Sequence, residues 1–418
     1  MSRDPVRPEQ GPLLLDARAT YAPYAAFAAF GIFWGAWGAA LPVLRTQAGV
    51  SDGQLGTALL FVGLGALPSM AFTGRAVDRF GLRVAAWLLA ALAGTGLLIT
   101  AGAHGMVPLV IGMLVVGAAS GAADVAINTL AGRAEHATAR PLLTRSHGLF
   151  SVGVVVASLS TGALLGAGLT PTATFTVVAV VMLALAAAAW RTSTSLHVPA
   201  PPSDTGTPTD ADEGGTGLRH ALRRIGPASP LLVVGLVAAL AYAIENAHQS
   251  WGAVMLTDTF AAPPQVAAAA PAAFAATAAL ARLSLAPLSR SHPTAVLLGG
   301  GVLATAGTAT LAVAPSVAVA LAGLVLAALG TATLFPTLLS RSLRRTDPAR
   351  HGRATSRVAT TAYLGFLLGP AYVGLLAEKS DLRGALLGVA ALALVFTVTA
   401  APVSAWAARR GADREPVA

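Results

Sequence analysis

Twelve long apolar segments, nearly free of charged residues, constrain the fold of this 418-residue chain more than any other feature. A helix needs about 20 apolar residues to cross a bilayer, whereas strands of membrane β-barrels show about ten residues of alternating polarity. The segments here are long and do not alternate. Charged residues make up only 11% of the chain, against roughly 25% in soluble domains, which excludes a soluble globular fold. We therefore predict an all-α polytopic membrane protein with 12 transmembrane helices.

The segments form two sets of six. They cover 21–44, 53–72, 84–103, 107–131, 143–169 and 172–190, then 231–256, 267–286, 295–314, 316–339, 354–377 and 385–408. The stretch between the sets is rich in Pro, Ser, Thr, Gly and acids, a composition that cannot bury a core. We therefore expect two six-helix halves, and the full division is an N-terminal tail (1–20), a first bundle (21–190), a flexible linker (191–227), a second bundle (228–408) and a C-terminal tail (409–418).

The basic residues behind the net charge of +9 are distributed unevenly between the two sides of the predicted helices. With the N-terminus placed in the cytoplasm, 24 of the 27 Lys and Arg residues fall in tails, linker and loops on that side. Arg45, Lys379 and Arg383 fall on the other side. Basic residues accumulate in cytoplasmic loops of membrane proteins. We therefore expect both termini to be cytoplasmic, and the positive charge implies no nucleic-acid partner.

The loop between the second and third predicted helices has the sequence GRAVDRFGLR, from Gly74 to Arg83. Gly81 permits a tight turn, and Asp78 can face the positive end of a neighbouring helix. Arg79 and Arg83 can pair with carboxylates across the interface between the halves. Such a loop can hold the cytoplasmic side shut in one state, so we predict a gating role for Gly74, Asp78, Arg79, Gly81 and Arg83. The alternative is an ordinary basic loop.

This loop resembles the G-x-x-x-D-R-x-G-R-R/K motif of the major facilitator superfamily. Other stretches are similar to a bacterial branch that includes MosC-like proteins and lies near the fucose permease. They are WGAWG at 34–38, SDGQLG at 51–56, GAADVAIN at 121–128, SHGL at 146–149, LFP at 334–336 and YLGFLLGP at 363–370. The resemblance implies a monomeric inner-membrane transporter that works by alternating access, with a cavity lined by helices 1, 4, 7 and 10.

Local signals refine three of the predicted helices. Ser51 and Gln54 have the spacing of a capping box, which predicts that the second helix starts directly after Ser51. Pro336 and Pro370 lie inside the tenth and eleventh apolar segments, where we expect kinks. Such kinks either let helix ends swing or shape the packing alone.

Asp124 and Glu245 are the acidic residues that lie well inside apolar segments. A charge there costs at least ~2.5 kcal/mol on insertion scales, so it normally has a partner or a function. Glu245 shares a helix face with His248 and Gln249, and a carboxylate beside a histidine suits proton exchange. We predict proton-coupling roles for Glu245, Asp124 and His248. The alternative for the Glu245 cluster is a structural polar network.

Asp124 has two readings that the sequence leaves open. Asn128 lies one helical turn away, and Asp124 falls in the cytoplasmic half of its helix, within reach of Arg79 or Arg83. Asp124 is therefore either a gating partner or a residue of the transport site. The resemblance favours the transport site, because the fucose permease has an acidic transport-site residue on its fourth helix.

Aromatic and polar side chains on the predicted helices are candidates for contacts with a solute. Indole rings stack on sugars and on aromatic or cationic groups, although they also serve in packing or face lipid. The candidates for solute binding are Trp34, Trp37, Asn128, Asn246, Gln249, Trp251 and Tyr363.

Together these features predict a secondary transporter of the bacterial inner membrane. They leave one main mechanism and two alternatives. The main prediction is proton-coupled symport of a small polar or sugar-like solute. The alternatives are a proton-coupled exporter of a metabolite or drug, and a non-transporting sensor on the same scaffold. The chain has no cysteine, no P-loop and no cluster of metal ligands, so we expect no enzymatic activity, cofactor or metal. The expected partners are the solute, protons and membrane lipid.

Overall fold

The predicted all-α membrane architecture is confirmed by a computed structural model that describes residues 20–193, 230–344 and 351–412. Within these residues, 12 helices are long and apolar enough to cross a membrane. The predicted tails and linker lie outside the described residues, apart from residues 20, 191–193 and 409–412.

The first half contains six helices, each of which is one span. They are α1 (Tyr21–Ala48), α2 (Asp52–Phe80), α3 (Val84–Gly102), α4 (Met106–Thr138), α5 (Leu142–Gly166) and α6 (Pro171–Ser193). The predicted capping box is confirmed at the start of α2. The Gln54 amide donates to the Ser51 hydroxyl over 3.3 Å, and the Ser51 amide donates to the Gln54 side chain over 3.0 Å.

The second half contains six spans, two of which are interrupted. The helices are α8 (Pro230–Phe260), α9 (Pro264–Ala267), α10 (Ala269–Ser291), α11 (Pro293–Ala312), α12 (Val317–Thr331), α13 (Leu334–Leu343), α14 (His351–Lys379) and α15 (Leu382–Ala412). The eighth span combines α9 and α10, and the tenth combines α12 and α13. Most helices extend beyond their apolar segments, because polar residues at a membrane surface can continue the helical hydrogen bonds.

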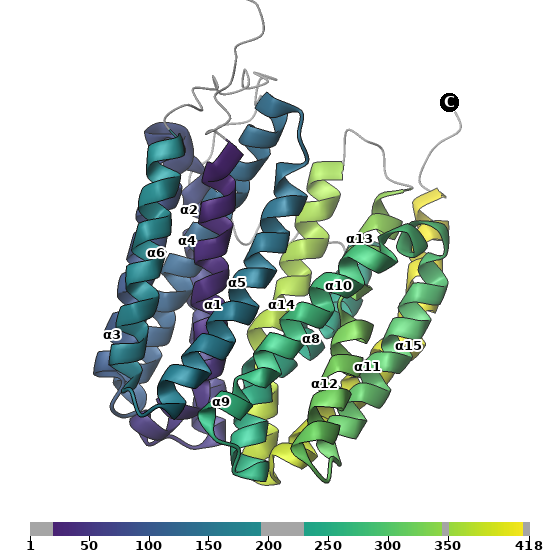
Figure 1. The fold of residues 1–418 in the computed structure, drawn as a ribbon. Helices are drawn as coiled ribbons and strands as arrows, with labels where there is room; N and C mark the ends of the chain where they lie inside the picture. Colours follow the sequence, from purple (N-terminus) through teal and green to yellow (C-terminus); the bar gives the residue numbers. More distant parts are fainter. Residues whose placement is uncertain (1–19, 194–229, 345–350, 413–418) are drawn as a thin grey trace, which may run out of the picture.

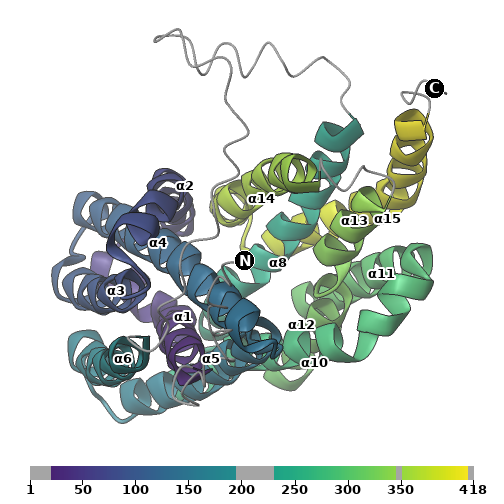
Figure 2. The ribbon, with the colours of Figure 1, turned by 90° about the horizontal axis from the view of Figure 1, so that it is seen from above.

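The two halves lie side by side, as Figure 1 shows, with the first half in purple to teal and the second in green to yellow. The start of α1 and the end of α15 lie on the same side of the bundle, which we call the termini side. The opposite side, where α9 lies, is called the far side. Figure 2 views the bundle along its helices and shows α5, α8, α10 and α14 between the outer helices of each half.

Small residues allow close helix packing at corresponding places in the halves. A Cβ atom added at Gly31 of α1 would lie 2.1 Å from the carbonyl oxygen of Phe150 in α5. One added at Gly365 of α14 would lie 1.7 Å from the carbonyl oxygen of Ala239 in α8. Membrane helices associate through such backbone contacts. In each half the contact joins the first and fifth spans, which supports a repeated architecture.

The halves are joined on the far side by four charged residues, which we call the far-side clamp: Arg45, Asp52, Asp258 and Glu378. Arg45 of α1 bonds to both carboxylate oxygens of Asp258 in α8, over 2.5 and 2.7 Å. Arg45 also pairs with Asp52 of α2. The Gly53 amide of α2 donates to Glu378 of α14 over 2.9 Å. The bonds to Asp258 and Glu378 join the far-side ends of the two halves, whereas the Arg45–Asp52 pair lies within the first half.

Candidate solute cavity

A cavity of about 270 Å³ lies between the two halves. This volume is close to the lower end of the range for small-molecule sites. The first half contributes lining residues from α1, α2, α4 and α5, and the second half from α8, α10 and α14. The first, fourth and seventh spans therefore line the cavity, as the resemblance implied. Among the described lining residues, none belongs to α12 or α13, which form the tenth span.

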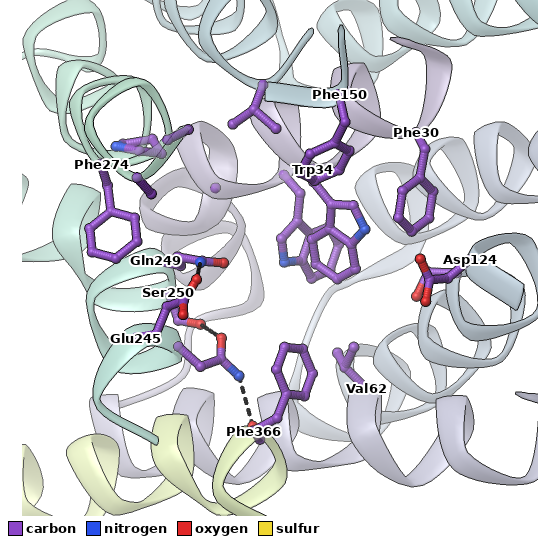
Figure 3. A pocket seen from close by; sticks show the side chains of 18 of the residues that line it. Phe30, Trp34, Val62, Asp124, Phe150, Glu245, Gln249, Ser250, Phe274 and Phe366 are labelled. Atoms are coloured by element: carbon purple, nitrogen blue, oxygen red, sulfur yellow. Dashed lines mark hydrogen bonds between the residues drawn. The ribbon is translucent and has the colours of Figure 1, made fainter. Parts of the chain in front are cut away.

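The first-half wall carries four aromatic side chains. Phe30, Trp34 and Trp37 project from α1, and Phe150 projects from α5. The Trp34 ring meets the Trp37 ring edge-on with centroids 6.3 Å apart, and Phe30 lies 5.8 Å from Phe150. Figure 3 shows Phe30 and Trp34 beside Asp124. The wall thus presents ring surfaces next to one carboxylate.

Asp124 is the acidic residue of this wall, half-buried on α4. The Asn128 amide group donates to the Asp124 side chain over 3.1 Å and to its backbone carbonyl over 2.9 Å. Asn128 itself is not among the lining residues that the structure describes. The structure therefore brings Asp124 to the cavity and places Asn128 behind it as a hydrogen-bond donor.

The second-half wall combines a cluster of polar side chains on α8 and α10 with the rings of Phe274, Tyr363 and Phe366. Glu245, Asn246, Gln249 and Ser250 line the cavity from α8, and Arg282 lines it from α10. One Glu245 carboxylate oxygen accepts from Arg282 over 2.8 Å and from Gln249 over 3.2 Å. The Ser250 hydroxyl donates to the Asn246 side chain over 3.2 Å. Figure 3 shows Glu245 across the cavity from Asp124.

Two prolines position polar groups of this second wall. A proline lacks the N–H that would bond to the carbonyl four residues earlier. Pro336 thereby frees the carbonyl of Ala332, which accepts from Arg282 Nε over 3.0 Å at the break between α12 and α13. Pro370 frees the carbonyl of Phe366, which accepts from Asn246 over 2.7 Å. Arg282 and Asn246 are therefore each held against a proline-freed backbone oxygen.

His248 and Trp251 are placed away from the cavity, inside the second half. His248 is 1% exposed, and its ring nitrogens lie 2.6 Å from the Ile244 carbonyl and 3.0 Å from the Thr308 hydroxyl. Trp251 is fully buried and donates to the Pro370 carbonyl over 3.1 Å. Of the other solute candidates, Trp34, Trp37, Asn246, Gln249 and Tyr363 line the cavity. The roles predicted for all of these residues stay predictions.

The predicted gating loop lies on the termini side, within the first half. Asp78 of α2 pairs with Arg133 of α4 over 2.6 Å. Arg79 lies 5.3 Å from the Phe80 ring, and Arg83 lies 4.8 Å from the Trp190 ring. Among the ion pairs of the described residues, none joins Asp124 to either arginine.

The two glycines of this loop differ in conformation. Gly81 has a φ of +79° and supplies the turn after α2, as its position in the loop suggested. Gly74 lies inside α2 with no atom near the place of a Cβ.

Arg282 and the far-side clamp were not singled out as functional from the sequence. Arg282 lies within an apolar segment, so the rule that identified Glu245 applies to it equally. The clamp residues lie near helix ends, where charges are common. Only their mutual contacts distinguish them.

A bundle of twelve spans in two halves, with a solute-sized cavity between them, is the architecture of a secondary transporter. The sequence model of the Major Facilitator Superfamily matches residues 24–255 and 234–416. This chain therefore belongs to the major facilitator superfamily, and it is a multi-pass membrane transporter of small solutes.

Known proteins similar to this chain agree with that assignment. An uncharacterized MFS-type transporter of Yersinia pestis is 29% identical over 370 residues, covering 87% of this chain and 90% of the relative. The crystal structure of a D-xylose–proton symporter has a TM-score of 0.70 at 14% identity, covering 92% of this chain and 96% of that one. A bacterial homolog of the human lysosomal transporter Spinster, inward-facing and occupied, has a TM-score of 0.69 at 17% identity, covering 96% and 98%. These structural likenesses concern the fold alone.

Proposed function

We propose that this chain couples proton movement to symport of a small polar solute across the bacterial inner membrane, with its termini side in the cytoplasm. The observation that carries the proposal is the Glu245–Arg282 pair. Glu245 lines the cavity with a side chain 12% exposed, and Arg282 is its charged partner. Protonation of Glu245 would remove the negative member of this pair and change the charge that a bound solute meets.

Alternating access would proceed by breaking contacts between the halves on the far side. Arg45, Asp258 and Glu378 join the halves there, so opening of that side requires the loss of these bonds. The far-side clamp would therefore act as a gate, in addition to the gating role predicted for the loop that contains Asp78. Membership of the MosC-like branch remains a prediction carried by the motifs of α1, α4 and α14.

Export is a second candidate, favoured by the aromatic side chains of the cavity. Phe30, Trp34, Phe150, Phe274 and Phe366 all line it, and ring surfaces suit an aromatic metabolite or drug. An exporter would use the same Glu245 carboxylate, and the entry of a proton would drive the exit of the solute. The direction of proton-driven movement separates the two candidates.

The test is transport by the full chain in proteoliposomes under an imposed pH gradient, with panels of sugars, polyols, amino acids and aromatic drugs. We expect Glu245→Gln to abolish gradient-driven accumulation and to retain exchange of solute across the membrane without net proton movement. Glu135→Gln is the matched control, because Glu135 lies outside the cavity lining and accepts from the Leu143 amide, as glutamine also can.

Gradient-driven accumulation that is unchanged in Glu245→Gln would contradict proton coupling through this residue. Movement of solute against the direction of proton flow would replace symport with export. If no solute moves while ligand addition changes binding of a partner protein, the sensor alternative replaces both.

A further inference from the structure

The two walls of the cavity carry charges of opposite sign that are available to a ligand. Asp124 lies on α4 of the first half, and Arg282 lies on α10 of the second half. A charged group in a weakly hydrated site is stabilised by a charged partner. A solute that spans the cavity can supply both partners at once.

The Asp124 end is suited to a cation. Its carboxylate accepts from Asn128, and among the described residues no ion pair involves it. Phe30 and Trp34 lie beside it in the cavity (Figure 3). A carboxylate next to aromatic ring surfaces can hold an ammonium group by ion pairing and cation–π contact.

The Arg282 end is suited to an anion. A guanidinium has five N–H donors, and the bonds to Ala332 and Glu245 use one donor each on Nε and Nη2. The Arg282 side chain lines the cavity and is 48% exposed, and among the described residues the hydrogen bonds of its guanidinium are those to Ala332 and Glu245. Its bond to the Ala332 carbonyl fixes the orientation of the group. A fixed guanidinium with free donors binds a carboxylate with two parallel bonds.

Glu245 links this end to the proton. While Glu245 is charged, it neutralises Arg282 across 2.8 Å. When Glu245 takes up a proton, Arg282 loses its counter-charge, and a solute carboxylate can replace it. Binding of the solute and binding of the proton would then favour each other, which symport requires.

We propose that the solute is a zwitterion, whose ammonium group binds at Asp124 and whose carboxylate binds at Arg282, with an apolar body against the aromatic wall. The inference rests on the proposed transport function and names its substrate class. A neutral sugar would leave Asp124 without a charged partner and, once Glu245 is protonated, Arg282 as well. A simple cation would leave the free Arg282 donors unused.

The test measures binding to the purified full chain in detergent by calorimetry, without a proton gradient. The probes are phenylalanine, 3- and 4-(aminomethyl)benzoate and 4-(aminomethyl)phenylacetate, which differ in the separation of their charges. Each is compared with its carboxamide, which is cationic only, and its N-acetyl derivative, which is anionic only. We expect at least one zwitterion to bind on the order of ten-fold more tightly than both of its derivatives, since each charged hydrogen bond contributes at least that factor.

Two substitutions assign the ends. Asp124→Asn should abolish the advantage over the N-acetyl derivative, and Arg282→Gln should abolish the advantage over the carboxamide. Arg282→Lys keeps the charge and tests the same end if Arg282→Gln fails to fold. It should weaken the preference for the carboxylate, because an ammonium cannot form the paired bonds. Glu135→Gln should change neither preference.

The inference is overturned if no zwitterion binds better than both derivatives, or if its advantage survives both substitutions. Equal binding of a carboxamide would identify the cavity as a site for organic cations. Binding of a sugar or polyol without any zwitterion would identify a neutral solute. Either outcome leaves proton coupling to be decided by Glu245→Gln, so the two failures are distinguishable.

Discussion

The far side and the termini side of the bundle each hold an arginine–aspartate pair, but the pairs connect different bodies. On the far side, Arg45 of α1 bonds to Asp258 of α8 and so joins the two halves. On the termini side, Asp78 of α2 bonds to Arg133 of α4 and stays within the first half. Only a contact between the halves changes when they rotate relative to each other. The far-side pair can therefore report or control the conformational state, whereas the termini-side pair stabilises one half here.

A recognisable motif and a contact between the halves occur on opposite sides of the bundle. The loop with the recognisable sequence contributes local contacts in this structure: Asp78 with Arg133, and Arg83 with the ring of Trp190. The Arg45–Asp258 pair of the far-side clamp, which lies outside the motifs, supplies a charged contact between the halves. A gating role for the loop would require a conformation in which its charged residues reach the second half.

Among the substitutions that test this difference between the sides, Arg45→Gln is expected to have the largest effect, which is to open the far side. It removes two bonds to Asp258 and leaves Asp52 and Asp258 without their shared cation. Because charged hydrogen bonds contribute about 1.5–3 kcal/mol each, opening of the far side should increase on the order of ten-fold or more. The chain has no cysteine, so Leu41→Cys, at a buried cavity position, gives a single labelling site. The measurement is its rate of modification by an impermeant maleimide added on the far side.

Arg133→Gln is the matched control for Arg45→Gln, because it removes the arginine of the pair within the first half. The labelling rate of Leu41→Cys should stay within about two-fold, because this exposed ion pair lies within the first half and does not connect the two halves. Equal acceleration by the two substitutions would contradict the distinction between the two sides.

Gly81→Ala should destabilise the termini side without opening the far side. Gly81 has φ +79° and ψ −177°, a conformation that only glycine adopts readily, so alanine is expected to cost about 1–3 kcal/mol. Gly74→Ala is the control in the same loop, because Gly74 is helical and has free space for a methyl group. It should be neutral or slightly stabilising. The measurement is the midpoint of thermal unfolding in detergent, and equal losses for the two variants would refute this assignment of Gly81.

Glu378→Ala is expected to give the smallest of these effects. It removes the acceptor of the Gly53 amide and leaves the Arg45–Asp258 pair intact. Because the Glu378 side chain is exposed to solvent, its hydrogen bond contributes less than the Arg45–Asp258 pair, and labelling of Leu41→Cys from the far side should rise by about a few-fold. Lys379→Ala, at the neighbouring exposed position, should leave the rate unchanged. If Glu378→Ala matched Arg45→Gln, the ion pair would not be the main contact of the clamp.

Helical geometry explains which residues of α8 could be predicted to line the cavity. Each residue turns a helix by about 100°. Gln249, four residues after Glu245, returns to within about 40° of it and lines the cavity. His248, three residues after Glu245, lies about 60° to the other side and packs into the second half. Glu245 and Gln249 face the cavity and His248 does not, because the cavity lies along only one side of α8.

Trp251 shows a limit of sequence likeness. Trp37-Gly38-Ala39 and Trp251-Gly252-Ala253 have the same sequence in the first helix of each half. Trp37 lines the cavity, whereas Trp251 is fully buried and bonds to the Pro370 carbonyl. The two identical tripeptides lie in different surroundings, because the surroundings of each indole depend on how its helix is rotated against the neighbouring helices. The tripeptide sequence does not specify that rotation.

The amino-acid sequence by itself determined the membrane class, the number of spans, the start of α2 and the need for partners at Asp124 and Glu245. These follow from local physics: a backbone in lipid must satisfy its own hydrogen bonds, and an isolated charge there is unstable. Only the tertiary structure decided that Glu245 faces Arg282, that Asp124 lies across the cavity, and that Arg45 holds α1 to α8. Those contacts join residues far apart in the chain, so they depend on how the helices rotate and pack, which composition and periodicity do not specify.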